Sequence, residues 1–436
     1  MNFFHSLQRV PWPQQLTTVA AFLVPGLALC LPSGYSYGAV LLLVGALLTA
    51  RRWPLQRQDR LTRWFAVSLL AMACLWVALA DPQEHWGKWD RPAKFVLGCM
   101  CLLFATTYCP TDARALFWGL LLGCLGAGAV ALWQIEVEGA LRASGFPTQR
   151  TNAIQWGNLA LLMATMLAVQ TLCLRAWLRP RIQLLAAVAV LAALNASVLS
   201  QSRGGWLALV LALPLGLFLL YRINRQALWK VVAGVFVAIT FVAVLNLQVF
   251  TQRWGAMEQE VQKYERQGES STSVGQRLEH WRLAWDMGRE RPIFGWGMGG
   301  YMAEKSARVA AGLYQPSVVE YKYVHNEMLD LFVKTGLVGV LVVLFFYAVP
   351  ILMFWPSRSR MARYSTQPMV VSQVLALRLS GLCIPVLYMG FGLTQVFFAH
   401  NNGIMLYIFM VVLTWATLLG VERDLARSVP PLPAQP

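Results

Sequence analysis

The chain has 436 residues, of which 57% are hydrophobic and 13% are charged. Because an average soluble domain is about one-quarter charged, this composition excludes an ordinary soluble protein and indicates a polytopic membrane protein. The formal net charge of +16 does not indicate a nucleic-acid partner, since much of the excess lies in short basic clusters between apolar runs, where it orients a membrane protein.

Twelve apolar runs are predicted to cross the membrane as helices, because each is close to the roughly 20 residues that a helix needs to span the hydrocarbon core. The first, about Leu16 to Leu31, shows no evident cleavage site and is interpreted as a retained signal anchor. The others lie at about 38–50, 64–80, 94–109, 115–135, 151–174, 182–199, 206–221, 228–250 and 325–354, with the last two on either side of 397–403. The predicted fold class is therefore an all-α polytopic membrane protein with about 12 transmembrane helices.

A long polar segment, residues 251–324, interrupts this pattern between the ninth and tenth runs. It holds nine of the chain's 20 acidic residues, whereas elsewhere charge comes in short clusters. A hydrophobic protein with one large extramembrane segment usually uses it to build a site or to bind a partner. We therefore divide the chain into transmembrane helices 1–9 (1–250), a large, mostly helical loop (251–324), transmembrane helices 10–12 (325–422) and a tail (423–436).

Four basic clusters determine the expected orientation of the chain. With the amino terminus in the cytoplasm, alternation of twelve spans places all four on the cytoplasmic side, in agreement with the positive-inside rule. The clusters are Arg51–Arg60, Arg175–Arg181, Arg222–Arg225 and Arg358–Arg363. The same alternation sends the large loop to the opposite face of the membrane and the tail to the cytoplasm.

Several basic residues are predicted on that opposite face, where the orientation rule does not require them. A ring of cations at this depth suits a phosphorylated or pyrophosphorylated lipid, and arginine offers a planar fork to phosphate oxygens. Alternatively, each cation extends its charge to the interface or pairs with a carboxylate of the loop. The residues are Lys88, Arg91, Lys94, Arg150, Arg203, Arg277 and His325.

His325 is predicted to begin the tenth transmembrane helix, beneath the large loop. Met328 and Leu329 follow it at helical spacing, while Glu327 marks another face. Histidine titrates near neutral pH and can accept a proton from a sugar hydroxyl, so His325 is the candidate general base and Glu327 the reserve candidate. An interfacial cap without chemistry is the alternative.

Three short motifs stand out along the chain: LSQSRGGWL at 199–207, RPIFGWG at 291–297 and HNEMLDLFVKTG at 325–336. They resemble motifs of the O-antigen ligase and polymerase superfamily of bacterial inner-membrane glycosyltransferases. The order of the motifs and the long loop between the last spans also resemble that superfamily. The resemblance covers most of the chain and is best from Gln149 to Gly339.

Within the superfamily the chain looks most like the ligase, which moves a finished O-antigen glycan from undecaprenyl pyrophosphate to lipid A–core on the periplasmic face of the inner membrane. The resemblance places the catalytic residues on His325, Arg277 and Arg203. O-antigen polymerases share the motifs loosely, so a polymerase is the alternative within the superfamily. Substrate-binding candidates come from the charge pattern and from the position next to the histidine: Arg150, Lys94, Arg91, Lys88 and Glu327.

The expected reaction is a direct displacement at the anomeric carbon, which inverts that carbon. Undecaprenyl pyrophosphate is already a competent leaving group, so no nucleotide is required. The loops on that face show no acidic cluster spaced to hold a divalent ion, and arginines can supply its charge, so neither a metal nor a cofactor is predicted. The predicted partners are the lipid-linked O-antigen, the lipid A–core acceptor and membrane lipid, whereas the sequence does not indicate an oligomeric state.

A secondary transporter is the alternative from a different class, because twelve spans with intramembrane prolines would suit one. Against it, the two halves of the chain show no clear similarity of the kind that inverted repeats leave. Charge also concentrates in one loop rather than at the middle of the membrane.

Overall fold

The computed structural model describes residues 10–52, 58–80, 86–146, 152–223, 272–362 and 367–428, together with Tyr364 and scattered residues between 232 and 266. Within this part of the chain the regular elements are helices and there is no strand. In chain order the α-helices are α2 (Trp12–Leu27), α3 (Tyr35–Thr49), α4 (Arg60–Ala78), α5 (Asp90–Thr107), α6 (Arg114–Leu132), α7 (Ala153–Leu174), α8 (Pro180–Leu199), α9 (Arg203–Ile223), α12 (Ser273–Glu290), α13 (Gly297–Ala310), α14 (Glu327–Phe354), α15 (Arg358–Ala362), α16 (Pro368–Gly392) and α17 (Asn401–Ser428).

Short polar side chains and prolines determine where several helices begin. Asp59 caps α4 and Asn152 caps α7, each by accepting hydrogen bonds from N–H groups of the first turn that have no partner within the helix. Pro180 and Pro368 stand at the start of α8 and α16, where a missing N–H costs no helical hydrogen bond.

Seven helices of the described chain are long and apolar enough to cross a membrane. The chain is accordingly an all-α, multi-pass membrane protein. The seven are Arg60–Ala78, Arg114–Val137, Ala153–Leu174, Pro180–Leu199, Glu327–Ala362, Pro368–Gly392 and Asn401–Leu425.

Eleven of the twelve predicted spans coincide with helices, namely α2 to α9, α14, α16 and α17. α2 and α3 have only 16 and 15 residues, and α5 has three charged residues near its start, at Asp90, Arg91 and Lys94. The ninth predicted span, 228–250, lies mostly outside the described residues. The total of twelve spans therefore stays a prediction.

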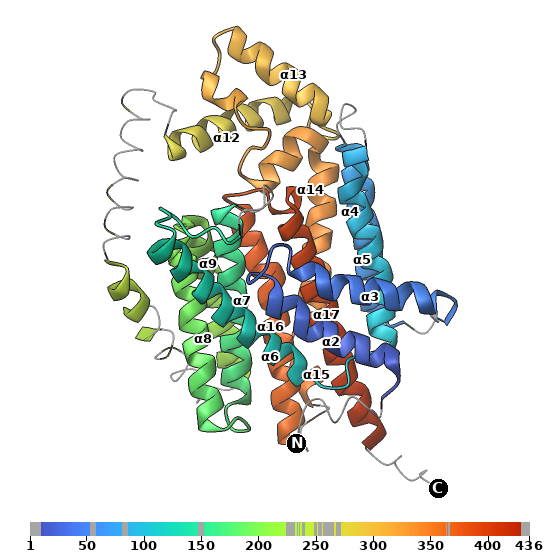
Figure 1. The fold of residues 1–436 in the computed structure, drawn as a ribbon. Coiled ribbons are helices and arrows are strands. Elements are labelled where there is room, and N and C mark those ends of the chain that lie inside the picture. Colours follow the sequence, from blue (N-terminus) through green and yellow to red (C-terminus); the bar gives the residue numbers. More distant parts are fainter. Residues whose placement is uncertain are drawn as a thin grey trace.

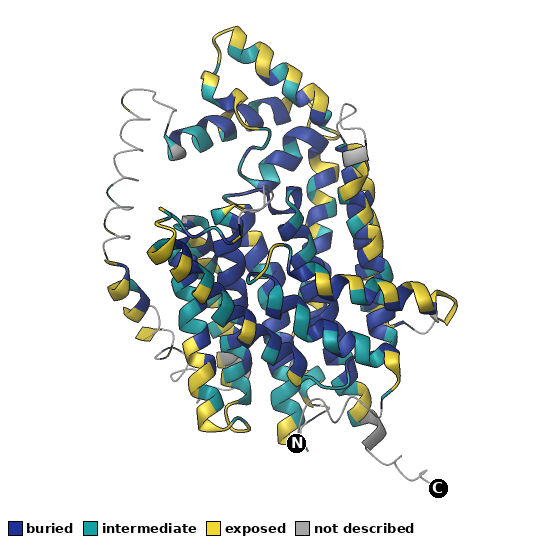
Figure 2. Ribbon diagram, in the orientation of Figure 1, coloured by how far each residue is buried: buried dark blue, intermediate teal, exposed yellow. Residues whose placement is uncertain are grey.

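α16 lies at the centre of the bundle, where it packs against α7, α9, α14 and α17 (Figure 1). Around it, α2 packs on α3 and α6, α6 packs on α8, α4 packs on α5 and α14, and α3 packs on α5. The inward faces of these helices are buried, whereas α3, α4 and α8 expose their outward faces (Figure 2). Exposed apolar side chains such as Leu48 and Leu184 cover these outward faces, as in a protein surrounded by lipid.

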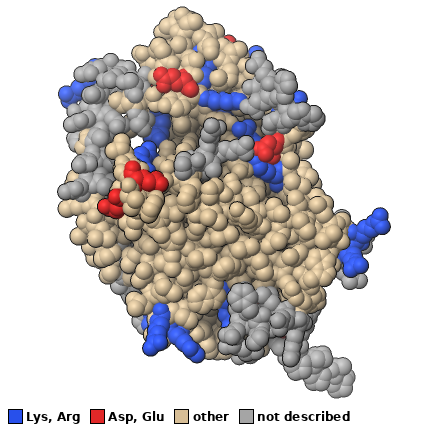
Figure 3. All heavy atoms as spheres, viewed as in Figure 1, with Lys and Arg blue, Asp and Glu red and all other residues tan. Residues whose placement is uncertain are grey.

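The bundle has two ends, which we name the site end and the basic end. The site end carries α12, α13, the α8–α9 connection and residues 393–400 between α16 and α17; the basic end carries the α7–α8 connection and α15. Figure 3 shows Lys and Arg side chains at both levels, with a belt almost free of charge between them apart from basic side chains at the right edge of the view. Such a belt has the character of a surface that faces hydrocarbon.

α12 and α13 have a small hydrophobic core of their own, which includes part of α14. Leu283 and Met287 of α12, Tyr301 of α13 and Val333 of α14 are fully buried in it. α12 also packs along α14. The two helices of the polar segment are therefore attached to the bundle through α14.

α14 is kinked at Gly336, whose φ of +64° is unfavourable for a residue with a side chain. Beyond the kink, the backbone N–H groups of Leu337 and Val338 donate to the carbonyls of Pro292 (2.8 Å) and Ile293 (3.3 Å). A Cβ at Gly336 would lie 2.2 Å from the backbone of Ile293. Backbone atoms form this contact, so a side chain at residue 336 would clash with the segment that follows α12.

We expect Gly336→Ala to destabilise the protein by more than about 2 kcal/mol, because it combines a strained φ with a backbone clash. Gly299→Ala is the matched control, since Gly299 lies in α13 with open space around it, and it should be neutral or slightly stabilising. Thermal unfolding of the purified protein in detergent compares the two. An unchanged melting temperature in Gly336→Ala would contradict the role assigned to the kink.

Candidate functional site

The segment Tyr321–His325 crosses the site end between α13 and α14 and is held by both helices. Lys305 of α13 and Lys334 of α14 donate to backbone carbonyls of this segment at 2.7 and 3.1 Å. Asp330 of α14 accepts from one of its backbone N–H groups at 3.0 Å. Side chains from two helices thus determine the path by which the chain reaches His325.

Asp330 and Lys334 form an ion pair of 2.6 Å whose side chains are 4% and 0% exposed. Removing two charges from water is costly, and the pair persists because each member also has a backbone partner in the segment. Lys334 Nζ lies in addition over the rings of Tyr301 and Tyr323, at 5.1 and 4.6 Å from their centroids. The pair therefore joins the start of α14 to α13 and to the segment Tyr321–His325, which we name the approach segment.

His325 does not begin the helix, contrary to the sequence prediction. α14 starts at Glu327 because Asn326 is its N-cap, whose side-chain oxygen accepts from the N–H groups of Met328 and Leu329 at 3.1 and 3.2 Å. His325 itself has a φ of +58°, in the left-handed region that is uncommon for a residue with a side chain. Strained backbone of this kind gathers at functional sites, where the surroundings hold it in place.

Gln395 determines which nitrogen of His325 carries the proton. Its Oε1 accepts from the backbone N–H of Val396 at 3.1 Å and lies 2.9 Å from Nδ1 of His325. Because the atom that accepts from an N–H must be the amide oxygen, Nδ1 of His325 is the protonated nitrogen that donates to it. Nε2 is then the basic nitrogen of the ring.

The surroundings of His325 favour its neutral form. Burial lowers the pKa of His325 below its ordinary value, and the nearby charge of Arg277 lowers it further, while the hydrogen bond to Gln395 acts in the opposite direction. The rings of Tyr321 and His280 lie 5.3 and 6.2 Å from the imidazole. With its pKa lowered from a value near 6.5, His325 is mostly neutral at pH 7 and can accept a proton.

α12 places Arg277 near His325. The helix begins after Thr272, whose hydroxyl accepts from an N–H of the first turn at 3.1 Å. His280, fully buried on the same helix, contacts the carbonyl of Val318 through Nε2 at 2.8 Å, which fixes the rotation of α12. Arg277 lies three residues before it, close enough for its charge to lower the pKa of His325.

α9 begins at Arg203, and its start reaches the same place. The next residue is glycine because a Cβ at Gly204 would lie 1.8 Å from Oγ1 of Thr394. Thr394 directly precedes Gln395, the partner of His325, so the start of α9 and the histidine meet at the connection between α16 and α17. The side chain of Arg203 lies outside the described part of the structure.

Glu327 is directed into the protein. Its side chain is buried, and its two oxygens accept from the backbone N–H groups of Phe397 and Phe398 at 3.2 and 3.1 Å. Both oxygens are thus occupied within the protein, whereas the sequence placed Glu327 among the substrate-binding residues. We interpret Glu327 as a positioning residue that holds the α16–α17 connection.

Arg91 lies at the same connection, on the side of α5. It donates from Nε to the carbonyl of Ala399 at 3.0 Å and from Nη2 to the hydroxyl of Tyr323 at 3.1 Å. Burial, together with the charges of Arg91 and His325, lowers the pKa of the adjacent His400 to about 4. Arg91 therefore connects the approach segment to the α16–α17 connection.

The other cations predicted from the charge pattern have local contacts or are not described. Lys94 forms an ion pair with Asp90, one turn earlier in α5. Lys88 lies over the ring of Trp89, 5.8 Å from its centroid. Arg150 falls outside the described residues. Of the predicted site residues, the structure brings together Arg277, His325, Arg91 and the backbone start of α9.

Several polar residues of the site end were not predicted from the sequence. Gln155 and Asn158, in the first two turns of α7, are fully buried, and none of their amide nitrogen or oxygen atoms has a hydrogen-bond partner in the described structure. Asn158 lies against Gly205, two residues into α9. Gln155, Asn158 and Gln395 have one feature in common that the sequence shows: each is a polar residue within an apolar run or at its end. A polar side chain at membrane depth is costly and therefore often marks a functional site.

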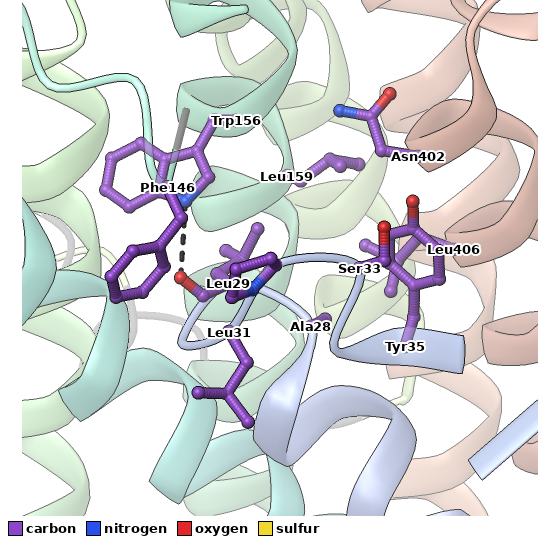
Figure 4. A pocket seen from close by; sticks show the side chains of 11 residues that line it. Ala28, Leu29, Leu31, Ser33, Tyr35, Phe146, Trp156, Leu159, Asn402 and Leu406 are labelled. Atoms are coloured by element: carbon purple, nitrogen blue, oxygen red, sulfur yellow. Dashed lines mark hydrogen bonds between the residues drawn. The ribbon is translucent and has the colours of Figure 1, made fainter. Parts of the chain in front are cut away.

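A small cavity lies beside the start of α7, between Trp156, Ser33 of the α2–α3 turn and Asn402 of α17 (Figure 4). The indole Nε1 of Trp156 donates to the carbonyl of Leu29 at 3.4 Å and closes one side of it. The cavity volume of about 20 Å³ suits one water molecule and excludes a sugar. Among the described residues, no group of His, Cys, Asp or Glu side chains is arranged to hold a metal ion.

We expect Asp330→Asn to destabilise the protein by roughly 3–5 kcal/mol, because the Lys334 charge then stays buried without its counter-ion. The double variant Asp330→Asn/Lys334→Met should be more stable than this single variant, since no buried charge remains. Glu290→Gln is the control, because it removes a partly exposed pair with Arg308 and should cost less than about 1 kcal/mol. Thermal unfolding in detergent ranks the three, and equal losses in the single and double variants would argue against the buried pair.

Comparison with known proteins gives two matches. Residues 187–344 match the family model described as O-antigen ligase. This stretch runs from α8 into α14 and contains Arg203, Arg277 and His325. An uncharacterized protein of Haemophilus influenzae is 24% identical over 384 residues, which cover 87% of this chain and 92% of that protein. The family match over 187–344 supports membership of the O-antigen ligase superfamily.

Proposed function

We propose that the protein transfers an O-antigen glycan from undecaprenyl pyrophosphate to a sugar hydroxyl of lipid A–core. The observation that carries this proposal is the position of His325, whose Nδ1 contacts Gln395, beside Arg277 and the start of α9. Displacement of a pyrophosphate needs both parts: a base for the proton of the attacking hydroxyl and fixed cations for the negative charge of the leaving group. The match to the O-antigen ligase family supports the reaction class.

The transfer is a single displacement at the anomeric carbon of the donor sugar. The acceptor oxygen forms a bond to this carbon while the bond from the carbon to the pyrophosphate oxygen breaks. The hydroxyl proton passes to Nε2 of His325, and the electron pair of the broken bond leaves with undecaprenyl pyrophosphate. His325 then releases its proton to solvent, and the anomeric carbon has been inverted.

Arg277 and Arg203 hold the pyrophosphate in this proposal. The planar guanidinium group binds two phosphate oxygens at once and keeps its charge at any working pH. Fixed cations in a site that excludes water contribute a few kcal/mol each to such a step. Arg150 is the third cation of the donor site, and Lys88 and Lys94 contact the lipid-linked donor at the rim, with no metal or nucleotide taking part.

The site end faces the periplasm of a bacterial inner membrane in this proposal, and the basic end faces the cytoplasm. The α7–α8 connection with Arg175–Arg181 and the start of α15 lie together at the basic end (Figure 1), which supports this orientation through the positive-inside rule. A lipid-linked donor and a lipid acceptor both present their sugars at the level of the site end.

The products formed by the purified protein test the function. It is incubated in detergent with undecaprenyl-pyrophosphate glycan and lipid A–core, with EDTA and without nucleotide. A glycan-bearing lipid A–core is the expected product. Longer glycan that is still attached to undecaprenyl pyrophosphate would make the protein a polymerase. Neither product, combined with flux of a labelled solute into vesicles, would favour the transporter.

We expect His325→Ala to lower the transfer rate roughly 100-fold to 10,000-fold, the usual contribution of a general base. Arg277→Lys should lower it at least about tenfold, because lysine lacks the planar fork. Arg282→Lys is the matched control on the same helix, since Arg282 lies over the ring of Tyr314, and it should keep near-normal activity.

The comparison is made at equal amounts of folded protein, in single-turnover transfer. Near-normal activity of His325→Ala would remove the histidine from the base role. Full activity of Arg277→Lys would reduce Arg277 to a point charge without a bidentate contact.

The pH dependence of the rate should depend on Gln395. The reaction requires neutral His325, so the acid limb of the wild-type profile should lie below about pH 6.5, the ordinary pKa of histidine. A carboxylate in Gln395→Glu stabilises the imidazolium, raises the pKa of His325 and moves the acid limb to higher pH. Gln395→Leu should lose rate at all pH values without this upward shift. Transfer rates measured between pH 5 and 9 test this prediction. Superimposable acid limbs in wild type and Gln395→Glu would contradict the assignment of His325 as the base oriented by Gln395.

A further inference from the structure

A larger cavity lies at the basic end, far from the site described above. Its volume is about 370 Å³, and it lies between the starts of α6, α8 and α16 and the end of α7. The figure is within the range of pockets that bind small molecules. The proposed transfer does not use this cavity, because His325 and its neighbours lie at the opposite end of the bundle (Figure 1).

Two arginines make the lining of this cavity positive. Arg114, the first residue of α6, is paired with the carboxylate of Asp112 at 2.7 Å. Arg179 precedes α8 and forms no ion pair with an acidic side chain in the part of the chain that the structure describes. One cation of the cavity is therefore balanced by an acid within the protein, and the other is available for an anion from outside.

The rest of the lining is partly polar and partly apolar. Gln170 and Gln373 contribute amide groups, and Gln170 is held in place because its Nε2 donates to Oγ of Ser380 at 3.2 Å. Phe117 and Leu377 contribute apolar surface. A ligand that fits this lining has a charged or polar head and an apolar portion.

The position of the cavity along the bundle points to the membrane surface. α7 has 22 residues, so it is about 33 Å long, close to the roughly 30 Å of a hydrocarbon core. The end of α7 thus lies at the level of lipid head groups. Trp118 and Trp177 also line the cavity, and tryptophan is enriched at this level of a membrane protein.

We infer that this cavity binds an anionic phospholipid. The phosphodiester lies between Arg179 and Arg114, the amides of Gln170 and Gln373 bind polar oxygens of the head and glycerol, and the first part of the acyl chains lies against the apolar wall. Basic pockets between transmembrane helices are a known mode of binding acidic head groups. A zwitterionic lipid offers no net negative charge to offset the unpaired Arg179.

Native mass spectrometry of the purified, delipidated full-length protein tests this inference. The protein is titrated in detergent with phosphatidylglycerol or with phosphatidylcholine, and we expect one molecule of phosphatidylglycerol to bind preferentially. Arg179→Gln should weaken this binding about tenfold, the effect of losing one charge-assisted contact. Arg181→Gln is the matched control, because it makes the same charge change two residues away without lining the cavity, and it should bind as the wild type does.

Arg114→Gln provides a second variant from the other side of the cavity, and thermal unfolding confirms that each variant is folded. Equal binding of the two lipids would overturn the inference. So would equal losses in Arg179→Gln and Arg181→Gln, which would indicate general attraction to a basic surface. Displacement of the lipid by millimolar inorganic phosphate would make this a site for free phosphate. None of these results depends on glycan transfer. The lipid-binding inference can therefore fail while the proposed function stands, and the reverse is also true.

Discussion

The buried carboxyl group of Glu327 is the constraint on which the site end depends. A carboxyl group buried in this position is costly unless it is hydrogen-bonded, and two backbone N–H groups of the α16–α17 connection donate to its two oxygens. These bonds fix the connection against the start of α14. The same connection carries Gln395, which orients His325, and Thr394, against which α9 begins. Two hydrogen bonds to one side chain therefore position the α16–α17 connection relative to α9, α14 and the candidate base.

The helices could be predicted from the sequence because a long apolar run has few alternatives to a transmembrane helix. His325 and the arginines were identified for two reasons. They are basic residues predicted on the membrane face where the positive-inside rule does not require them, and short motifs around them resemble a known superfamily. The position of His325 before the helix was not predicted, although Asn326 directly before the apolar run is a helix-start signal that the sequence contains. Gln395 could not be identified, because it lies 70 residues from His325 in the chain and only the packing of α16 brings the two together.

Burial decides the role of charged residues that look alike in the sequence. Asp330 and Lys334, at helical spacing near a span end, have the pattern of an interfacial ion pair, yet both are buried beneath α13. Arg179 at the basic end has no such partner in the described structure. The first pair fixes the path of the chain to the candidate base, whereas an exposed arginine at the depth of lipid phosphates is suited to an external anion. A lysine charge thus supports the fold at the site end, whereas an arginine charge at the basic end is the one that we infer to bind a lipid.

The stereochemistry of the transfer tests the central claim most directly, because a base at His325 and arginines on the leaving group describe a single displacement. The measurement is the anomeric configuration of the new glycosidic bond, determined by nuclear magnetic resonance on the product and compared with that of the donor. Inversion is the predicted result. Retention would contradict the account, because it requires a covalent glycosyl–enzyme intermediate and a nucleophile where we place a base.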